Sequence, residues 1–104
     1  MILYNVTVNI DENVAEEWLQ WMKEKHIPDV MATGMFLENR ICRIDGFEEG
    51  GLSYAIQYVA PDQAHYDRYQ EEFAAKLQEE HTLRYQGKFG AFRTVLEIIH
   101  QVHK

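Results

Sequence analysis

The stretch MILYNVTVNIDENVAEEWLQWMKEKHIP, residues 1–28, contains a change of hydrophobic period that decides the fold. In residues 1–10 the larger apolar side chains alternate, and one face takes Ile2, Tyr4, Val6, Val8 and Ile10. Period two is typical of a strand with one buried face. From residue 14 the period becomes helical, and one arc of the helix takes Val14, Trp18, Leu19, Trp21 and Met22. The stretch therefore predicts a strand and then an amphipathic helix that ends near His26 or Ile27, because the residue before a proline disfavours the helical conformation.

The rest of the chain continues this alternation of strands and helices. Pro28 suits the first turn of a second, short helix, and a strand follows over residues 36–44. The glycine-rich stretch 45–51 predicts a turn, so the strand over 52–59 returns antiparallel. A longer helix starts at Pro61-Asp62 and ends at Gly87, and the β-branched and aromatic residues after it predict a closing strand. The order βαββαβ predicts a single ferredoxin-like domain over residues 1–104, of class α+β, with a four-stranded antiparallel sheet and two helices on one face.

Composition excludes several classes of partner. The formal net charge of −7 disfavours nucleic acids and anionic membranes, both of which attract lysine and arginine. The single cysteine, Cys42, excludes an internal disulfide, and it resembles a small core residue. The chain also shows no secretory leader and no apolar run of about 20 residues, so we expect a cytoplasmic protein.

The sheet face away from the helices predicts a homodimer. By alternation this outer face takes Asn5, Thr7, Arg43, Ser53, Ala55, Gln57, Arg93 and Glu97, which is a set with few charges for a solvated sheet. The closing strand is apolar almost to its end, and such an edge invites association. Two sheets packed face to face would cover both features. The alternative is a monomer with a solvated sheet face and a frayed tail.

Two histidines are the candidate catalytic residues. The helical arcs direct His26 and His81 into the space between the helices and the sheet. We expect Tyr4, Trp18, Met22, Tyr54, Tyr58 and Phe73 to line a pocket in that space. Neutral imidazoles among tyrosines can move a proton near neutral pH, although a histidine near a helix end is also stabilised there simply by backbone carbonyls. His100 and His103 fall on opposite faces of a strand, so no metal is expected there, and no motif predicts a cofactor.

The sequence also resembles known families. Residues 1–10, 16–28, 51–58, 69–89 and 91–99 resemble a small bacterial family that is described as a domain of unknown function. More distantly, the pattern is similar to the dimeric α/β-barrel superfamily, which includes monooxygenases of the antibiotic-biosynthesis type, EthD-like proteins and haem-degrading enzymes. That resemblance implies a homodimer, a substrate pocket between helices and sheet, and chemistry without a cofactor.

One motif carries the EthD-like resemblance. The pattern W-x-x-x-H-x-P is matched by His26 and Pro28, while its aromatic position falls on Met22, next to Trp21. The haem-degrading branch uses an asparagine that points from the first strand towards the helices. Here Asn5 and Asn9 lie on the opposite face by alternation, which argues against that activity.

Two functions follow from these observations. The first is a small-molecule-binding protein or cofactor-independent enzyme, with a small organic ligand held between helices and sheet. The second is a non-catalytic dimeric module for protein interaction or regulation, in which the core is filled and both histidines are satisfied. This architecture hosts many functions, so the fold alone does not decide between them.

Overall fold

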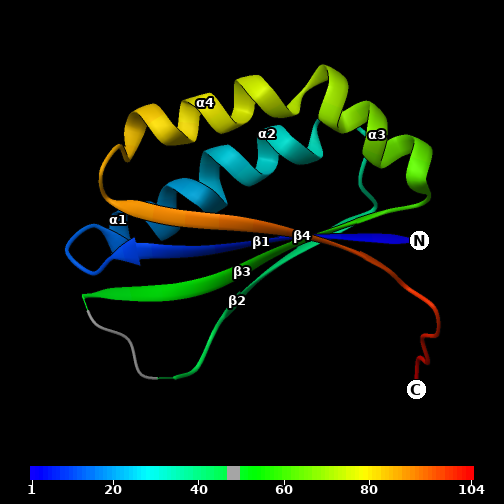
Figure 1. Cartoon of the computed structure of the whole chain (residues 1–104), viewed down its shortest axis with the longest axis horizontal. Coiled ribbons are helices and arrows are strands. Elements are labelled where there is room, and N and C mark those ends of the chain that lie inside the picture. Colours follow the sequence, from blue (N-terminus) through cyan, green and yellow to red (C-terminus); the bar gives the residue numbers. More distant parts are fainter. Residues whose placement is uncertain (47–49) are drawn as a thin grey trace.

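A computed structural model shows a two-layer domain and describes residues 1–46 and 50–104. Helices cover one face of a curved antiparallel sheet and leave the other face open (Figure 1). The strands are β1 (Ile2–Asp11), β2 (Glu38–Arg43), β3 (Gly51–Ala60) and β4 (Phe89–Glu97), in the order β2-β3-β1-β4. This is the βαββαβ arrangement of the ferredoxin-like fold, as the sequence predicts.

The first helical segment continues through Pro28 without a break. It consists of α1 (Ala15–Trp21), a π-helical turn η1 (Met22–His26) and α2 (Ile27–Met31). The expected helix end near His26 is therefore a change of helical type rather than a break. Pro28 has no N–H to donate, and its ring would clash with the carbonyl four residues earlier, so the wider π turn just before it accommodates the proline.

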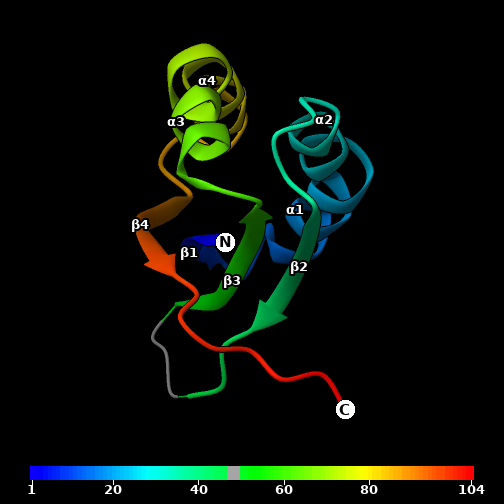
Figure 2. The ribbon, with the colours of Figure 1, turned by 90° about the vertical axis from the view of Figure 1, so that its right-hand side faces the viewer.

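The second helical segment is interrupted once. It consists of α3 (Gln63–Glu72) and α4 (Ala74–Arg84), which meet at Phe73. Asp62 caps α3, because its Oδ1 accepts a hydrogen bond from the backbone N–H of His65 at 2.9 Å. Seen from the end, the two helical segments lie side by side and form one layer above the sheet (Figure 2).

The main core lies between the sheet and these helices. The residues of the central strands β1 and β3 that alternate towards the helices are mostly buried, and Ile10 and Ile56 are fully enclosed. They meet Trp18, Met22 and Leu77 from the helices. The period-two and helical patterns of the sequence therefore predict the main core correctly.

The outer face differs from the prediction in three residues. The strand register places Arg93 opposite Val6, Arg43 opposite Tyr54 and Glu97 opposite Ile2. Directly opposed residues project from the same face of a sheet, so all three lie on the helix-facing side. The error in β4 has a simple cause, since both of its faces mix apolar and polar residues and neither phase stands out.

Neutral side chains form most of the polar contacts on the outer face. Gln57 Nε2 donates to Asn5 Oδ1 at 3.2 Å, and Arg40 Nε donates to Gln57 Oε1 at 2.7 Å. Phe92 and Leu96 alternate onto the same face and are exposed. Cys42 is exposed there as well, opposite Ala55, so the expectation of a core cysteine is wrong.

The ends and turns add little to the core. Residues 47–49, inside the predicted glycine-rich turn, lie outside the described residues. After β4 the chain continues without regular structure, and His100 and His103 are exposed. In the described part of the chain, no helix has the length and apolar character needed to cross a membrane.

Two leucines of α4 test this account of the core. Leu77 is 9% exposed and Leu83 is 65% exposed. We expect Leu77→Ala to lower the free energy of unfolding by about 2–4 kcal/mol, because it removes buried methyl groups and leaves a cavity. Leu83→Ala is the matched control and should change it by less than about 0.5 kcal/mol in urea denaturation. Equal losses would contradict the described packing of α4.

Candidate functional site

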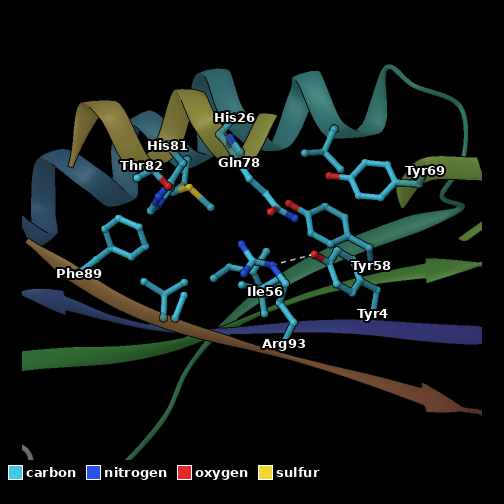
Figure 3. A pocket seen from close by; sticks show the side chains of 15 residues that line it. Tyr4, His26, Ile56, Tyr58, Tyr69, Gln78, His81, Thr82, Phe89 and Arg93 are labelled. Atoms are coloured by element: carbon cyan, nitrogen blue, oxygen red, sulfur yellow. Dashed lines mark hydrogen bonds between the residues drawn. The ribbon is translucent and has the colours of Figure 1, made fainter. Parts of the chain in front are cut away.

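A cavity of about 50 Å³ lies between the sheet and the helices. Figure 3 shows side chains from both layers converging on it. Its polar lining residues are Tyr4, His26, Tyr58, Tyr69, Gln78, His81, Thr82 and Arg93. Its apolar lining residues are Val6, Val8, Met22, Val30, Ile56, Phe89 and Ala91.

The structure brings together five of the eight residues named from the sequence. These are Tyr4, Met22, His26, Tyr58 and His81. The other three lie beside the cavity rather than in its wall. Trp18 and Tyr54 pack against each other in the core, with ring centroids 5.1 Å apart, and Phe73 is half-buried at the junction of α3 and α4.

His81 accepts a hydrogen bond from the neighbouring helical segment, and this bond orients its ring. Trp18 Nε1 donates to His81 Nε2 at 2.9 Å, and both side chains are buried. An indole N–H only donates, so Nε2 must be the accepting nitrogen and the proton of the neutral ring lies on Nδ1. Burial lowers the pKa of His81 to about 4, and the neighbouring His26 and Arg93 act in the same direction. His81 is therefore a neutral, oriented hydrogen-bond donor.

His26 is also neutral at neutral pH, but its imidazole is not held by a hydrogen bond to any described residue. It stacks on Trp21 with centroids 5.2 Å apart, and its centroid lies 5.7 Å from that of His81. Burial lowers the pKa of His26, while Glu80 and Asp29 oppose the shift and Lys25 adds to it. No hydrogen bond to its imidazole occurs within residues 1–46 and 50–104. His26 can therefore accept a proton without losing a bond that holds the fold.

Tyrosine hydroxyls form the other end of the cavity. Tyr58 is 2% exposed and Tyr69 is 3% exposed, and burial raises the pKa of each above its ordinary value. Neither hydroxyl makes a hydrogen bond to any described residue, although both residues line the cavity. The Tyr4 hydroxyl accepts a hydrogen bond from Arg93 Nε at 3.1 Å. Figure 3 shows these three hydroxyls directed towards the same region as Gln78 and Arg93.

Several lining residues were not named from the sequence. The alternation pattern places Arg93 on the wrong face of β4, and Tyr69 lies within the predicted longer helix but is not among the residues expected to line the pocket. Gln78 stands three residues before His81, a spacing that places both on one helix face and could have drawn attention to it. Arg93 could have been found as the only charge on a strand segment of small and apolar residues, FGAFRTVL.

The side chains that line the site can transfer protons and form hydrogen bonds. Among the described residues, no cluster of three or more histidine, cysteine, aspartate or glutamate side chains could hold a metal ion. Two neutral imidazoles, three phenols and one guanidinium remain. Such a set can orient a small polar molecule and receive a proton from it.

A double-mutant cycle tests the brace between Trp18 and His81. We expect Trp18→Phe and His81→Leu, measured singly and together by urea unfolding, to show a coupling free energy of about 1–2 kcal/mol. The cycle of Trp21→Phe with His81→Leu is the control, since Trp21 contacts the His81 ring without a hydrogen bond. A coupling no larger than in the control would contradict the assigned bond and tautomer.

Solved structures share this fold at low sequence identity. A dimeric ferredoxin-like protein from an uncultured marine organism aligns with a TM-score of 0.77 and 8% identity, over 97% of each chain. A mutant of SnoaB, a cofactor-independent oxygenase from Streptomyces nogalater, aligns with a TM-score of 0.69 and 11% identity, over 99% of this chain and 98% of its own. An ethyl tert-butyl ether D (EthD) family protein from Bacillus halodurans aligns with a TM-score of 0.64 and 12% identity, over 94% of this chain and all of its own.

The sequence itself identifies the family. No curated protein matches the chain at a significant level. The family model described as Domain of unknown function (DUF4286) matches residues 1–99, which is nearly the whole chain. The chain therefore belongs to the DUF4286 family.

Proposed function

We propose that the protein binds a small organic molecule in the cavity between its helices and sheet, with His26 as a proton acceptor and His81 as an orienting donor. The observation that carries the proposal is a set of three side chains that border the cavity and whose polar atoms have no hydrogen-bond partner in the described chain: the half-buried His26 and the buried Tyr58 and Tyr69. Buried polar groups are normally hydrogen-bonded, and a ligand or water in the cavity would supply the missing partners. Cofactor-independent chemistry on a phenol or an activated C–H is compatible with this set.

The non-catalytic alternative rests on a different observation. The bond between Trp18 and His81 is what a purely structural histidine would show. His26 has no such partner among the described residues and lies beside an open space. The cavity therefore favours ligand binding over a filled interaction module.

The nature of the ligand site can be tested with 4-nitrophenol, whose absorbance reports its ionisation. We expect nuclear magnetic resonance shifts to cluster on the cavity residues and to saturate. Ala91→Phe should abolish these shifts, because Ala91 lines the cavity and a phenyl ring would fill it. Ala75→Phe is the control, since Ala75 is exposed on α4 outside the cavity.

His26→Gln separates binding from proton transfer in the same experiment. The variant should still bind 4-nitrophenol but should lower the ionised fraction of the bound probe, because amide side chains do not accept a proton near neutral pH. Shifts scattered over the surface, or unchanged in Ala91→Phe, would contradict the proposed site and favour the interaction module.

We also propose that two copies associate through their outer sheet faces. Phe92 is 63% exposed and Leu96 is 44% exposed, on a face whose other side chains are largely neutral. The exposed apolar tail residues Ile99 and Val102 follow directly. An apolar sheet face of this kind is stable when a second sheet covers it. The dimeric ferredoxin-like protein named above shares this fold, and this supports a homodimer. The thiol of Cys42, exposed on the same face, fits a reducing compartment such as the cytoplasm.

Sedimentation equilibrium at micromolar concentration tests the homodimer. We expect the parent chain to sediment as two copies and Phe92→Glu to sediment as one, because a charge would be buried in the interface. Leu83→Glu, at an equally exposed site on α4, should leave the mass unchanged. A monomeric parent chain, or a dimeric Phe92→Glu, would contradict this interface.

A further inference from the structure

The two ends of the cavity carry different functional groups. In Figure 3 His81, Thr82 and Phe89 lie towards one end, and Tyr4, Tyr58 and Tyr69 lie towards the other, with Arg93 below them. The tyrosine end contains hydrogen-bond donors. The histidine end contains the candidate proton acceptor, His26.

Only one formal charge lies among the described lining residues. It is the guanidinium of Arg93, since both histidines are neutral at neutral pH and no carboxylate lines the cavity. The surface of the protein is acidic, with a net charge of −7. A positively charged side chain at the cavity of an acidic protein is a specific feature, because the net charge alone would favour cationic ligands.

The contacts of Arg93 leave most of its donors available. Its Nε donates to the Tyr4 hydroxyl at 3.1 Å, and it forms no ion pair within the described chain. The Tyr4 hydroxyl accepts that bond, so its own proton is free to be donated into the cavity. Arg93 thus supplies a positive charge and also orients a phenol donor.

Two further donors are buried beside this pair. Tyr58 and Tyr69 are 2% and 3% exposed, and neither hydroxyl has a partner in the described chain. Both phenols remain protonated at neutral pH, because burial disfavours their charged forms. Three phenol O–H groups and a guanidinium thus surround one small volume with donors.

From this cluster we infer that the cavity binds a small organic carboxylate, whose oxygens lie among Tyr4, Tyr58, Tyr69 and Arg93 and whose body extends towards His26. The inference rests on the proposed ligand-binding function and specifies its substrate class. The cavity volume of about 50 Å³ suits a headgroup of a few atoms, since one water needs roughly 10–15 Å³. The ring of the ligand then lies towards the histidine end, beside Ala91 and Thr82, which line the cavity and are exposed.

Benzoate and benzamide test the inference, because they share a ring and differ in charge. We expect titrations followed by nuclear magnetic resonance to show benzoate binding at the tyrosine end at least about tenfold more tightly than benzamide. Arg93→Gln should weaken benzoate about 10- to 100-fold, as expected for loss of a charged hydrogen bond, and should leave benzamide nearly unchanged. Arg68→Gln is the control, since Arg68 pairs with Glu72 on the exposed side of α3.

Tyr58→Phe provides a second variant that keeps the ring and removes only the hydroxyl. It should weaken benzoate several-fold, and its unfolding midpoint in urea shows whether the fold is intact. Equal binding of benzoate and benzamide, or benzoate affinity that survives both Arg93→Gln and Tyr58→Phe, would overturn the carboxylate inference while 4-nitrophenol binding still upholds the cavity as a ligand site. Loss of all three probes from the cavity would overturn both.

Discussion

The hydrogen bond from Trp18 to His81 is the constraint on which the site depends. It joins α1 to α4, and its two residues are 63 positions apart in the sequence. Because the indole donates, the bond also fixes the proton of His81 on Nδ1. This one contact joins the two helical segments and determines which nitrogen of His81 can donate a hydrogen bond. Without it, His81 would be a buried acceptor with no partner, which is a costly arrangement.

The tyrosine end of the site includes two hydroxyls, those of Tyr58 and Tyr69, that make no hydrogen bond to the described chain. Tyr4, Phe36, Tyr58 and Tyr69 form an aromatic cluster with ring centroids 4.8–6.2 Å apart, so their rings stabilise the core in the usual way. The hydroxyls of Tyr58 and Tyr69 do not contribute to that packing. Phenylalanine at either position would fill the same space, and this suggests that the hydroxyls serve a bound molecule at some cost in stability.

Much of the fold could be predicted from the sequence, whereas the site could be predicted only in part. The alternation in residues 1–10 and the helical arc around Trp18 and Met22 each have one strong period, so strand, helix and main core follow directly. Arg93 was misplaced because β4 has no dominant face. The partner of His81 could not be predicted, since a contact across 63 residues depends on how the layers pack. The π turn before Pro28 likewise depends on geometry that a helical wheel assumes to be uniform.

The most direct test of the central claim is a titration of the two imidazoles by nitrogen-detected magnetic resonance, from about pH 8 to about pH 4. His81 should stay neutral with its proton on Nδ1 until its pKa of about 4, and His26 should titrate below its ordinary value of 6.5. A depressed pKa means that the unfolded chain binds more protons, so the stability that His81 contributes should be complete above its unfolded pKa and should disappear as the pH falls towards 4. An Nε2–H tautomer, or a His81 that titrates at its ordinary pKa, would contradict the account.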